Sequence, residues 1–328
     1  MILHRQLGKY DLKTSAVGYG AMVAEGWYGA VDEKTSIDTI RHALDIGVDF
    51  IDTADAYGNG HNEELVGRAI KGRRHDAVIA TKFGIVFDPA ETGTEWKLNF
   101  GFSLRINGRP EYVRKCLDNS LRRLGVQTID LWYLHWPDRS IPIEETVGAM
   151  SEAVKAGKVH HLGLSNVTDE ETRRAHKIHP IACVQYEYSL WRREVETRLM
   201  PTLRELGIGL VPWSPLGNGF LTGTVKELGK DDFRNRDIRL SGENRKANTD
   251  RFAPLIALAK ELGITPAQLA LAWLLHQGPD IVPIPGTRRK ERVDENAGAA
   301  AVKLSEDVLK RIEEIAPAGA VAGKSLID

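Results

Sequence analysis

Short apolar runs alternate with segments of helical periodicity along nearly the whole chain. Apolar runs of about four to eight residues, bounded by turn residues, are typical of buried strands. Such runs predict strands at Ser15–Gly20, Asp49–Thr53, Ala77–Phe83, Ile129–Trp136, Val159–Asn166, Cys183–Glu187, Gly209–Trp213 and Ile281–Pro285. Apolar residues three or four positions apart predict helices at Thr35–Ile46, Asn62–Lys71, Glu111–Leu124, Glu144–Ala156, Asp169–His179, Glu194–Leu206, Arg251–Gln277, Arg289–Ala301 and Leu304–Ile315.

Residues that start and end helices stand at the boundaries of these segments. Pro110 and Pro266 fall at first helical positions, where a missing N–H is tolerated. Thr168 followed by Glu171 has the spacing of a capping box. A glycine follows several helical runs, as is common after helix C-termini: Gly47, Gly125, Gly157, Gly207 and Gly263.

Alternating strands and helices predict the α/β class, and eight strand–helix pairs predict a closed (β/α)8 barrel, the TIM-barrel fold. The rival is an open doubly wound sheet, which often carries a Gly-x-Gly-x-x-Gly motif after its first strand. Only fragments of that motif occur, at Gly58–Gly60 and Gly217–Gly219, and these are typical of turns. The barrel is therefore the better prediction, with residues 1–328 as a single domain.

Two segments between predicted elements are unusually long, Gly84–Arg109 and Gly217–Asp250. Both follow the C-terminal ends of strands, and loops of this length in a compact domain are usually functional. They place the predicted site at the C-terminal rim of the barrel. The helix at Leu304–Ile315 lies beyond the last strand–helix pair, so we expect it to pack outside the barrel as an extra element.

The amino-acid composition and net charge are those of an ordinary globular protein and argue against nucleic-acid binding. Hydrophobic residues make up 42% of the 328 residues and charged residues 27%, as in ordinary globular proteins. Lys and Arg total 44 against 45 Asp and Glu, which gives a formal net charge of -1. A nucleic-acid binder would carry a basic excess, so we expect no nucleic-acid partner.

Cysteine content and the N-terminal residues bear on location. Cys116 falls in a predicted helix and Cys183 in a predicted strand, and two cysteines do not make a disulfide framework. The first residues lack the charged start and apolar block of a signal peptide. No apolar run approaches the about 20 residues of a membrane span. These features predict a cytoplasmic protein without a membrane partner.

Polar side chains interrupt the apolar strands near their C-terminal ends, although strands of a parallel barrel should be continuous hydrophobic runs. Asp52 ends the second predicted strand, and Tyr57 lies just beyond it. Lys82 ends the third strand and His135 the fourth. Because the C-terminal ends of barrel strands share one rim, we expect these four side chains to converge.

The expected electrostatics of this group favour proton transfer to an oxygen. Burying Lys82 requires an anionic partner, and Asp52 on the neighbouring strand is the obvious candidate. The Lys82 ammonium is expected to lower the pKa of the Tyr57 phenol from its ordinary value of about 10. His135 would donate a hydrogen bond to a substrate oxygen or position Tyr57. An acid beside a polarising group suits reduction of a carbonyl, provided that something supplies hydride.

Each of these residues alone is more simply explained as structural, because ion pairs and satisfied histidines are common at barrel rims. Their convergence on one rim favours an active site. His160 and His161 are different, because adjacent residues on a strand point to opposite faces and make a poor metal pair. We therefore predict no metal site.

Several sequence blocks resemble the signatures of the aldo-keto reductase superfamily. They are Phe50–Gly58, Ala80–Phe83, Ile129–His135 and Gly163–Asn166. Further blocks are most similar to the microbial and plant branch that includes perakine reductase: Pro212–Gly223, Asp232–Arg234, Gly242–Asn244 and Ile281–Thr287. The resemblance runs from about Leu7 to about Ala300, and it implies a (β/α)8 barrel that reduces aldehydes or ketones with NADPH.

The resemblance also implies roles for the four strand-end residues, which match the catalytic tetrad of the family. Tyr57 would protonate the carbonyl oxygen while NADPH delivers hydride to the carbon. Lys82 would tune Tyr57, Asp52 would hold Lys82 charged and in place, and His135 would assist.

Cofactor contacts are implied by the same resemblance. Ser165, Asn166 and Gln185 would hydrogen-bond the nicotinamide carboxamide, and Trp213 would stack on its ring, where many relatives have Tyr. The other matching positions implied to contact the cofactor are Gly20, Met22, Asp52, Ser214, Pro215, Leu216, Gly217, Gly219, Gly286, Thr287, Arg288, Arg292, Glu295 and Asn296.

The cofactor preference depends on cations for a 2′-phosphate. Arg288 and Arg292 follow the last predicted strand beside a helix start, where a phosphate is favoured. Gly286 stands where other branches of the family have Lys, so one basic contact is absent. NADPH is therefore favoured, and NADH stays an alternative.

The expected partner is a small-molecule carbonyl compound. Trp27, Tyr28 and Trp136 lie on rim segments and either wall an apolar substrate pocket with Tyr57 and His135 or are ordinary packing residues. The sequence leaves the substrate, the direction of the reaction and the oligomeric state open.

Two other functions stay open at this point. A strand-end lysine can form a Schiff base, which would make the protein a lyase, although pairing of Lys82 with Asp52 would keep it protonated and oppose this. The family also resembles potassium-channel β subunits, so the other alternative is a cofactor-binding, redox-sensing module.

Overall fold

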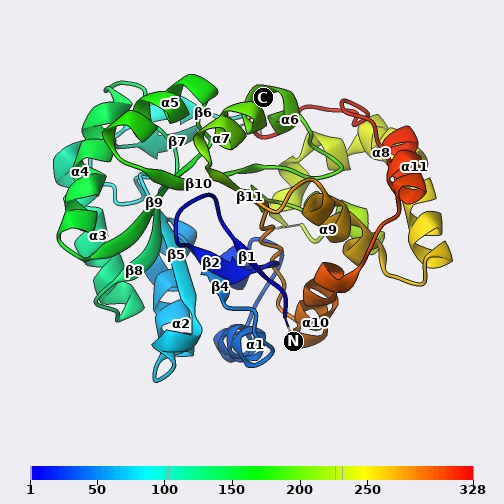
Figure 1. The fold of residues 1–328 in the computed structure, drawn as a ribbon, viewed down its shortest axis with the longest axis horizontal. Coiled ribbons are helices and arrows are strands. Elements are labelled where there is room, and N and C mark those ends of the chain that lie inside the picture. The colour runs from blue at the N-terminus through cyan, green and yellow to red at the C-terminus, as the bar shows by residue number, and fades with distance from the viewer. Residues whose placement is uncertain (1, 100, 102, 226, 231, 328) are drawn as a thin grey trace.

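The computed structural model describes residues 2–99, 101, 103–225, 227–230 and 232–327. Its main sheet has seven parallel strands in the order β11–β10–β9–β8–β5–β4–β3, curled into a nearly closed barrel with helices outside it (Figure 1). The strands are β3 (Tyr19–Gly20), β4 (Phe50–Asp52), β5 (Val78–Phe83), β8 (Ile129–Leu134), β9 (Val159–Ser165), β10 (Ile181–Glu187) and β11 (Gly209–Trp213). The predicted (β/α)8 barrel is confirmed.

The eighth predicted strand, Ile281–Pro285, is wrong as a regular strand, although this segment closes the barrel. On one side its backbone N–H groups donate to β11 at 3.0 and 3.2 Å. On the other side the carbonyls of Pro283 and Pro285 accept from Gly18 and Gly20, at 2.9 and 3.2 Å. Neither proline has an N–H to return a bond, so half of the ladder toward β3 is missing.

Helices cover the outside of the barrel in the predicted order, with ends set by local signals. The first five are α1 (Glu33–Asp45), α2 (His61–Ile70), α3 (Pro110–Leu124), α4 (Ile143–Lys155) and α5 (Asp169–Ile178). The Thr168–Glu171 capping box and the helix-starting prolines are confirmed. All the glycines predicted to follow helices have positive φ, which costs a glycine little.

Two predicted helices are each split in two. Glu194–Leu206 forms α6 (Val195–Arg198) and α7 (Met200–Leu206), because Pro201 is tolerated only in the first turn of a helix. Arg251–Gln277 is divided between α8 (Gly242–Glu261) and α9 (Pro266–His276), whose axes are bent by 93°. Between them Gly263 has positive φ and Thr265 caps α9. The chain ends with α10 (Lys290–Gly298) and α11 (Glu306–Ile315), and α11 packs against α8.

The first predicted strand is wrong over most of its length. Ser15 ends an antiparallel hairpin of β1 (His4–Gln6) and β2 (Lys13–Ser15), and only Tyr19–Gly20 joins the barrel. The hairpin loop buries Leu7 and Leu12 against residues of the barrel interior. The dark-blue hairpin therefore covers the N-terminal end of the barrel strands, where the Lys9 N–H donates to the Gly207 carbonyl just before β11 (Figure 1).

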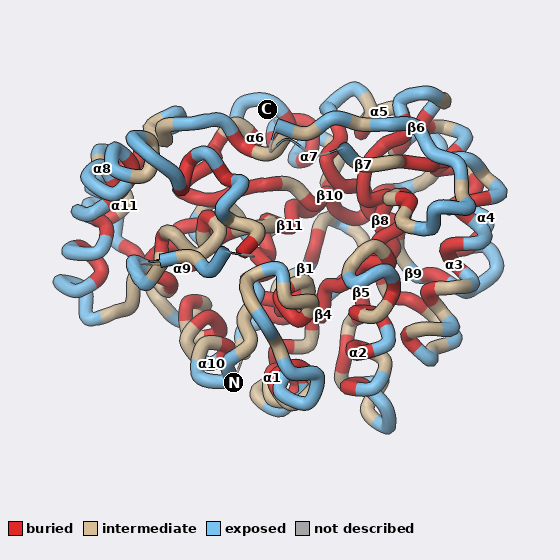
Figure 2. Tube along the Cα trace, turned by 180° about the vertical axis from the view of Figure 1, so that it is seen from behind, coloured by how far each residue is buried: buried red, intermediate tan, exposed pale blue. Residues whose placement is uncertain are grey.

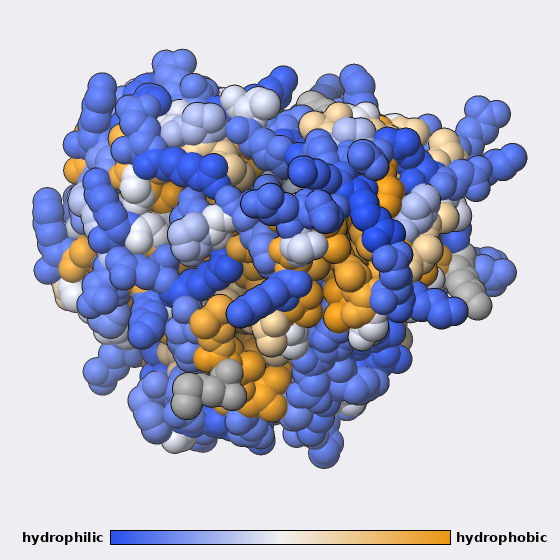
Figure 3. All heavy atoms as spheres, turned by 45° about the vertical axis from the view of Figure 1, so that its right-hand side comes forward, coloured by the Kyte–Doolittle hydropathy of each residue, from blue (hydrophilic) through white to orange (hydrophobic). Residues whose placement is uncertain are grey.

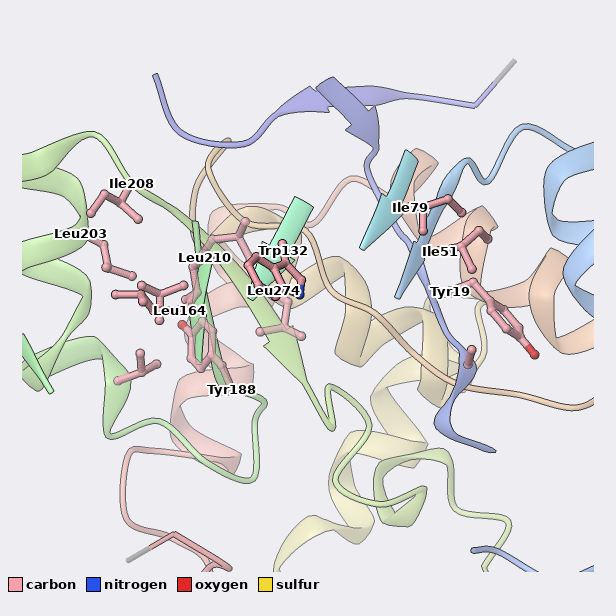
Figure 4. Packing of buried hydrophobic residues seen from close by; sticks show 14 of the residues in the cluster. Tyr19, Ile51, Ile79, Trp132, Leu164, Tyr188, Leu203, Ile208, Leu210 and Leu274 are labelled. Carbon is pink, nitrogen blue, oxygen red and sulfur yellow. The ribbon is translucent and has the colours of Figure 1, made fainter. Parts of the chain in front are cut away.

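The core has two layers, because adjacent strand residues point to opposite faces. Leu131 and Tyr133 belong to the barrel interior, whereas Trp132 between them packs outward under the helices. Figure 4 shows part of this outer layer, including Trp132 and Leu164. The buried segments run through the middle of the molecule, and the exposed ones lie on the outer helices and loops (Figure 2).

The long rim segments contain structure that the sequence pattern did not predict. The first carries a hairpin of β6 (Thr94–Lys97) and β7 (Ser103–Ile106), and it includes Phe100 and Phe102, which lie outside the described residues. The described residues of the second form three short 3-10 helices, η4 (Phe220–Thr222), η5 (Phe233–Arg236) and η6 (Ile238–Leu240). Both segments follow strand C-terminal ends, so they stand above the predicted site.

The face shown in Figure 3 is mainly hydrophilic, with hydrophobic residues gathered across its middle. Among the described residues, no single helix has the length and apolar character needed to cross a membrane; only the bent pair α8 and α9 together meets those two criteria.

Candidate active site

Lys82 is the centre of a buried hydrogen-bond group at the C-terminal rim. Its Nζ donates to Asp52 Oδ1 at 2.6 Å, to the Thr53 carbonyl at 2.7 Å and to the Tyr57 hydroxyl at 3.2 Å. The second oxygen of Asp52 accepts from Gln185 Nε2 at 2.7 Å. Lys82 and Asp52 are buried, whereas Tyr57 is half-buried and reaches a cavity. The three bonds use every N–H of the ammonium, which fixes the side chain.

The strand register brings these groups together. β4 and β5 are neighbours, and Asp52 pairs with Ala80. Lys82 follows Ala80 by two residues and therefore points to the same side of the sheet. The backbone then leaves β4 and returns the Tyr57 hydroxyl to Lys82 within a short turn. The predicted convergence of carboxylate, ammonium and phenol is present in the structure.

Burial and charge oppose one another in this group. Burial raises the pKa of Tyr57 above its ordinary value, and the Lys82 ammonium opposes this rise without reversing it. The predicted net lowering is therefore wrong, because the cost of desolvating a phenolate exceeds the attraction of one cation. Burial opposes the charge of Lys82, but Asp52 and Tyr57 outweigh it and raise the pKa of the ammonium. At neutral pH Tyr57 carries its proton beside a cation.

His135 lies against Tyr57 as the sequence predicts. The two rings meet edge to face, with centroids 5.8 Å apart and planes at 83°. His135 Nδ1 is buried without a hydrogen-bond partner among the described atoms. Burial, and then repulsion by Lys82, hold the pKa of His135 well below its ordinary value, so the imidazole is neutral. A neutral ring keeps one N–H donor and one acceptor.

The low pKa of His135 predicts acid sensitivity. In the unfolded chain the imidazole binds a proton near pH 6.5, whereas in the folded protein it stays neutral. The contribution of His135 to the free energy of unfolding is therefore complete above pH 6.5. It is lost as the pH falls from there toward the pKa that His135 has in the folded protein. Urea denaturation at about pH 7.5 and about pH 5.5 measures how much free energy of unfolding is lost at the lower pH. This loss should be smaller for His135→Asn than for the wild type. Equal losses would contradict the buried, neutral imidazole.

A cavity of about 640 Å³ opens above this group. Every residue implied to contact the cofactor lines it except Gly217, and so do Trp27, Tyr28, Tyr57, His135 and Trp136. Gly217 lies behind the wall, where a Cβ would come within 2.8 Å of the Trp191 ring. Lys82 does not line the cavity, and Tyr57, to which it donates, lies between it and the cavity.

Polar amide groups from neighbouring strand ends form one part of the cavity wall. Asn166 Nδ2 donates to the His135 carbonyl and to Ser165 Oγ, both at 3.1 Å. Trp213 Nε1 donates to Asn166 Oδ1 at 3.3 Å. The indole and the amide are therefore held in place by these bonds, and Ser165, Asn166 and Trp213 all line the cavity.

The cations predicted for a phosphate lie at the start of α10. Arg288 also has a structural role, because its guanidinium donates to the carbonyls of residues 28–30 at 2.7 to 3.0 Å. Arg292 forms an ion pair with Glu295. Both arginines line the cavity at the N-terminal end of a nine-residue helix, an arrangement that suits an anion.

The sequence matches the model of the aldo/keto reductase family over residues 16–317. The chain belongs to the aldo/keto reductase family. This oxidoreductase is 45% identical over 323 residues to the probable aldo-keto reductase 1 of Glycine max, and the match covers 97% of this chain and 90% of that protein.

Solved structures place the reductase in the same fold family. The glycerol dehydrogenase of Gluconobacter oxydans superposes with a TM-score of 0.83 at 29% identity, over 95% of this chain and 94% of that chain. An aldo/keto reductase of Klebsiella pneumoniae, solved in complex with NADP and acetate, superposes with a TM-score of 0.75 at 26% identity, over 99% of each chain.

The reductase has further cavity residues that the sequence pattern missed. Leu98 and Leu104 come from the β6–β7 hairpin, and Leu326 comes from the end of the chain. The tail is held there because Asn99 Nδ2 donates to the Ser325 carbonyl at 2.8 Å. Leu98 and Leu326 are isolated leucines in irregular segments and Leu104 lies in a four-residue strand, and no periodicity distinguishes them in the sequence.

Backbone strain marks the same rim. Among the described residues, the non-glycine positions with positive φ are Asn59, Asn166, Ser214 and Asn218. Three of them line the cavity, and Asn59 lies in the turn after Tyr57. Such conformations cost free energy and concentrate at functional sites. Asn218 was not predicted as a site residue. Its Oδ1 accepts a hydrogen bond from Ser214 Oγ at 2.6 Å, and this bond fixes this part of the cavity wall.

Proposed function

We infer that this protein is an NADPH-dependent reductase of aldehydes or ketones in which Tyr57 is the proton donor. The observation that carries this proposal is the Lys82 ammonium, held by Asp52 and donating to a Tyr57 hydroxyl that opens on the cavity. Tyr57 keeps its proton at neutral pH, and the adjacent cation stabilises the phenolate that remains after transfer.

The other residues at the rim orient the substrate carbonyl. His135 brings a neutral imidazole that lines the cavity beside Tyr57, and this ring can hydrogen-bond the oxygen that Tyr57 protonates. Trp27 and Trp136 wall the cavity with apolar surface, which excludes water from the proton transfer. Metal-dependent polarisation of the carbonyl is not part of the proposal.

The cavity residues fit a nicotinamide dinucleotide. Ser165, Asn166 and Gln185 present amide and hydroxyl groups that match a carboxamide, and Trp213 presents a flat aromatic face. Arg292 at the start of α10 suits a phosphate. When bound, the dinucleotide supplies the hydride. The Klebsiella pneumoniae relative solved with NADP supports the same cofactor for this chain.

The direct test follows NADPH absorbance with purified protein and an activated aromatic aldehyde, with identification of the alcohol product. NADPH consumption that requires the aldehyde and matches the alcohol formed would support the proposal. Tight NADPH binding without turnover over a varied panel of carbonyl compounds would favour the redox-sensing module instead.

The Schiff-base alternative is opposed by the environment of Lys82. The residue is 0% exposed, and all three N–H groups of its ammonium are bonded within the protein. A nucleophilic lysine must be neutral and reach the substrate carbon. Lys82 meets neither requirement, so borohydride should trap no carbonyl substrate on it.

Cofactor preference gives a separate prediction. Arg292→Ala should weaken NADPH binding about tenfold to hundredfold, because one charge-assisted contact to the 2′-phosphate is lost. NADH binding should change less than about twofold, since NADH lacks this phosphate. Dissociation constants from protein fluorescence quenching measure both. Lys290→Ala removes an exposed cation of the same helix and serves as the control. An equal loss for NADPH and NADH would contradict the role of Arg292.

A further inference from the structure

A second polar network lies beside the tetrad and is not explained by it. Asn62 is a fully buried residue at the start of α2. Its Oδ1 accepts from Thr53 Oγ1 at 2.6 Å, and its Nδ2 donates to the Ala21 carbonyl at 3.0 Å and to Glu25 Oε1 at 2.8 Å. The Thr53 carbonyl is one of the three acceptors of Lys82 Nζ. Asn62 thus connects the catalytic lysine to Glu25.

Glu25 lies directly on the turn that carries Tyr57. This turn, η2 (Tyr57–Gly60), continues through Gly58, Asn59 and Gly60, which all have positive φ. A Cβ on Gly58 would fall 2.0 Å from Glu25 Oε2, so the backbone and the carboxylate are in contact. Asn59 is the non-glycine residue of the three, and positive φ at such a residue persists when its surroundings impose it. The Glu25 carboxylate is one such constraint.

The opposite side of the turn is constrained as well. A Cβ on Gly60 would fall 2.7 Å from Arg123 Cδ, and Arg123 is anchored by Glu63 at 2.6 Å. The turn is therefore enclosed between a carboxylate and a guanidinium. The position of the Tyr57 hydroxyl relative to Lys82 depends on both.

His61, a partly exposed residue, forms an ion pair with the buried Glu25. Its Nδ1 lies 3.1 Å from Glu25 Oε2, and its Nε2 lies 2.9 Å from Glu33 Oε1 on α1. Arg68 on α2 contacts the other oxygen of Glu33 at 2.8 Å. Glu25 is only 7% exposed, whereas His61 and Glu33 are 38% and 54% exposed. The network therefore runs from a buried lysine to a solvent-accessible imidazole.

We propose that Asn62 and Glu25 are positioning residues that hold Tyr57 at its distance from Lys82, and that His61 locks Glu25 in this position. The proposal rests on the proposed function, since the quantity that it governs is proton donation by Tyr57. Neither residue lines the cavity, so Glu25 acts through the turn and Asn62 acts through Thr53 and Glu25.

The lock depends on pH. Hydrogen bonding to Glu25 raises the pKa of His61 above its ordinary value, and Glu33 adds to this rise while burial opposes it. Arg68 faces Glu33 rather than the imidazole, and Arg123 of α3 faces Glu63. Because the pKa of His61 is raised in the folded protein, the charged contact between His61 and Glu25 is complete below pH 6.5. It is lost as the pH rises through the pKa that His61 has in the folded protein.

Glu25→Ala is the first test. It should lower kcat about tenfold, because a small displacement of an acid from its reacting position costs at least that much. The KM for the aldehyde and the dissociation constant for NADPH should each change less than about twofold. Glu25→Gln keeps an oxygen for Asn62 Nδ2 but not the ion pair with His61, so it should recover part of the kcat. Asp38→Asn, which breaks an exposed ion pair of α1 with Lys34, is the control.

The pH profile separates positioning from a merely structural role. The kcat of the wild type should fall as the pH rises through the folded-state pKa of His61, which is raised above 6.5, whereas His61→Gln, whose amide does not titrate, should lack this fall. Superimposable profiles would overturn the lock. A Glu25→Ala protein with a lower melting temperature but unchanged kcat would overturn the positioning role, and so would a Glu25→Gln protein as slow as Glu25→Ala. A wild type without turnover would instead contradict the proposed function.

Discussion

Tyr57→Phe is expected to lower kcat for carbonyl reduction about a thousandfold, since loss of a positioned general acid costs about 10²- to 10⁴-fold. The phenylalanine ring fills the same space and keeps the edge-to-face contact with His135. Only the hydroxyl that accepts from Lys82 Nζ is lost. Initial rates from NADPH absorbance at saturating aldehyde measure the effect.

The NADPH dissociation constant of Tyr57→Phe should stay within about twofold of the wild-type value, because the proton donor acts on the substrate oxygen. Tyr10→Phe removes a phenol that bonds to His176 outside the cavity, and it is the matched control. A Tyr57→Phe protein with more than about a tenth of the wild-type kcat would assign proton donation to another group.

Lys82→Met should impair both stability and activity. Methionine is close to lysine in shape but leaves the buried Asp52 carboxylate without its cation, and breaking a buried pair in this way costs about 3–5 kcal/mol. The kcat should fall by at least about a hundredfold, because nothing then stabilises the Tyr57 phenolate. Urea denaturation and steady-state kinetics measure the two effects.

The double variant Asp52→Asn with Lys82→Met separates these effects. It removes the unpaired charge, so most of the free energy of unfolding should return while kcat stays low. Lys158→Met is the control, because Lys158 pairs with Asp118 on the surface and its loss should cost less than about 1 kcal/mol. If the double variant recovered activity as well as stability, the ammonium would not be the group that supports Tyr57.

Local physical signals in the sequence were enough to predict much of the fold. The Thr168–Glu171 capping box and the prolines at helix starts act within a single turn, so neighbouring residues decide them. The prediction that Asp52, Lys82 and His135 converge used only one rule, that parallel barrel strands end at one rim. A charge at the end of a buried strand needs a partner, so these positions could be identified from the sequence.

Long-range packing decided what the sequence pattern did not predict. The Ile281–Pro285 segment closes the barrel through hydrogen bonds to both neighbours, but its prolines prevent a regular ladder. The hairpin loop at Leu7 and the tail residue Leu326 take their roles from surfaces formed by distant parts of the chain. No local rule identifies such residues, because their partners are far away in the sequence.

By itself, then, the sequence predicted the barrel, the helix ends that carry caps or prolines, and the strand-end carboxylate, cation and imidazole, because these follow from periodicity, capping and the cost of an unpaired buried charge. Only the tertiary structure decided the protonation state of Tyr57 and the hydrogen-bond partners of Arg288. Burial outweighs Lys82 and keeps the proton on Tyr57, and Arg288 bonds to the carbonyls of residues 28–30. Desolvation and hydrogen-bond geometry depend on every surrounding atom, and those atoms come together only when the chain folds.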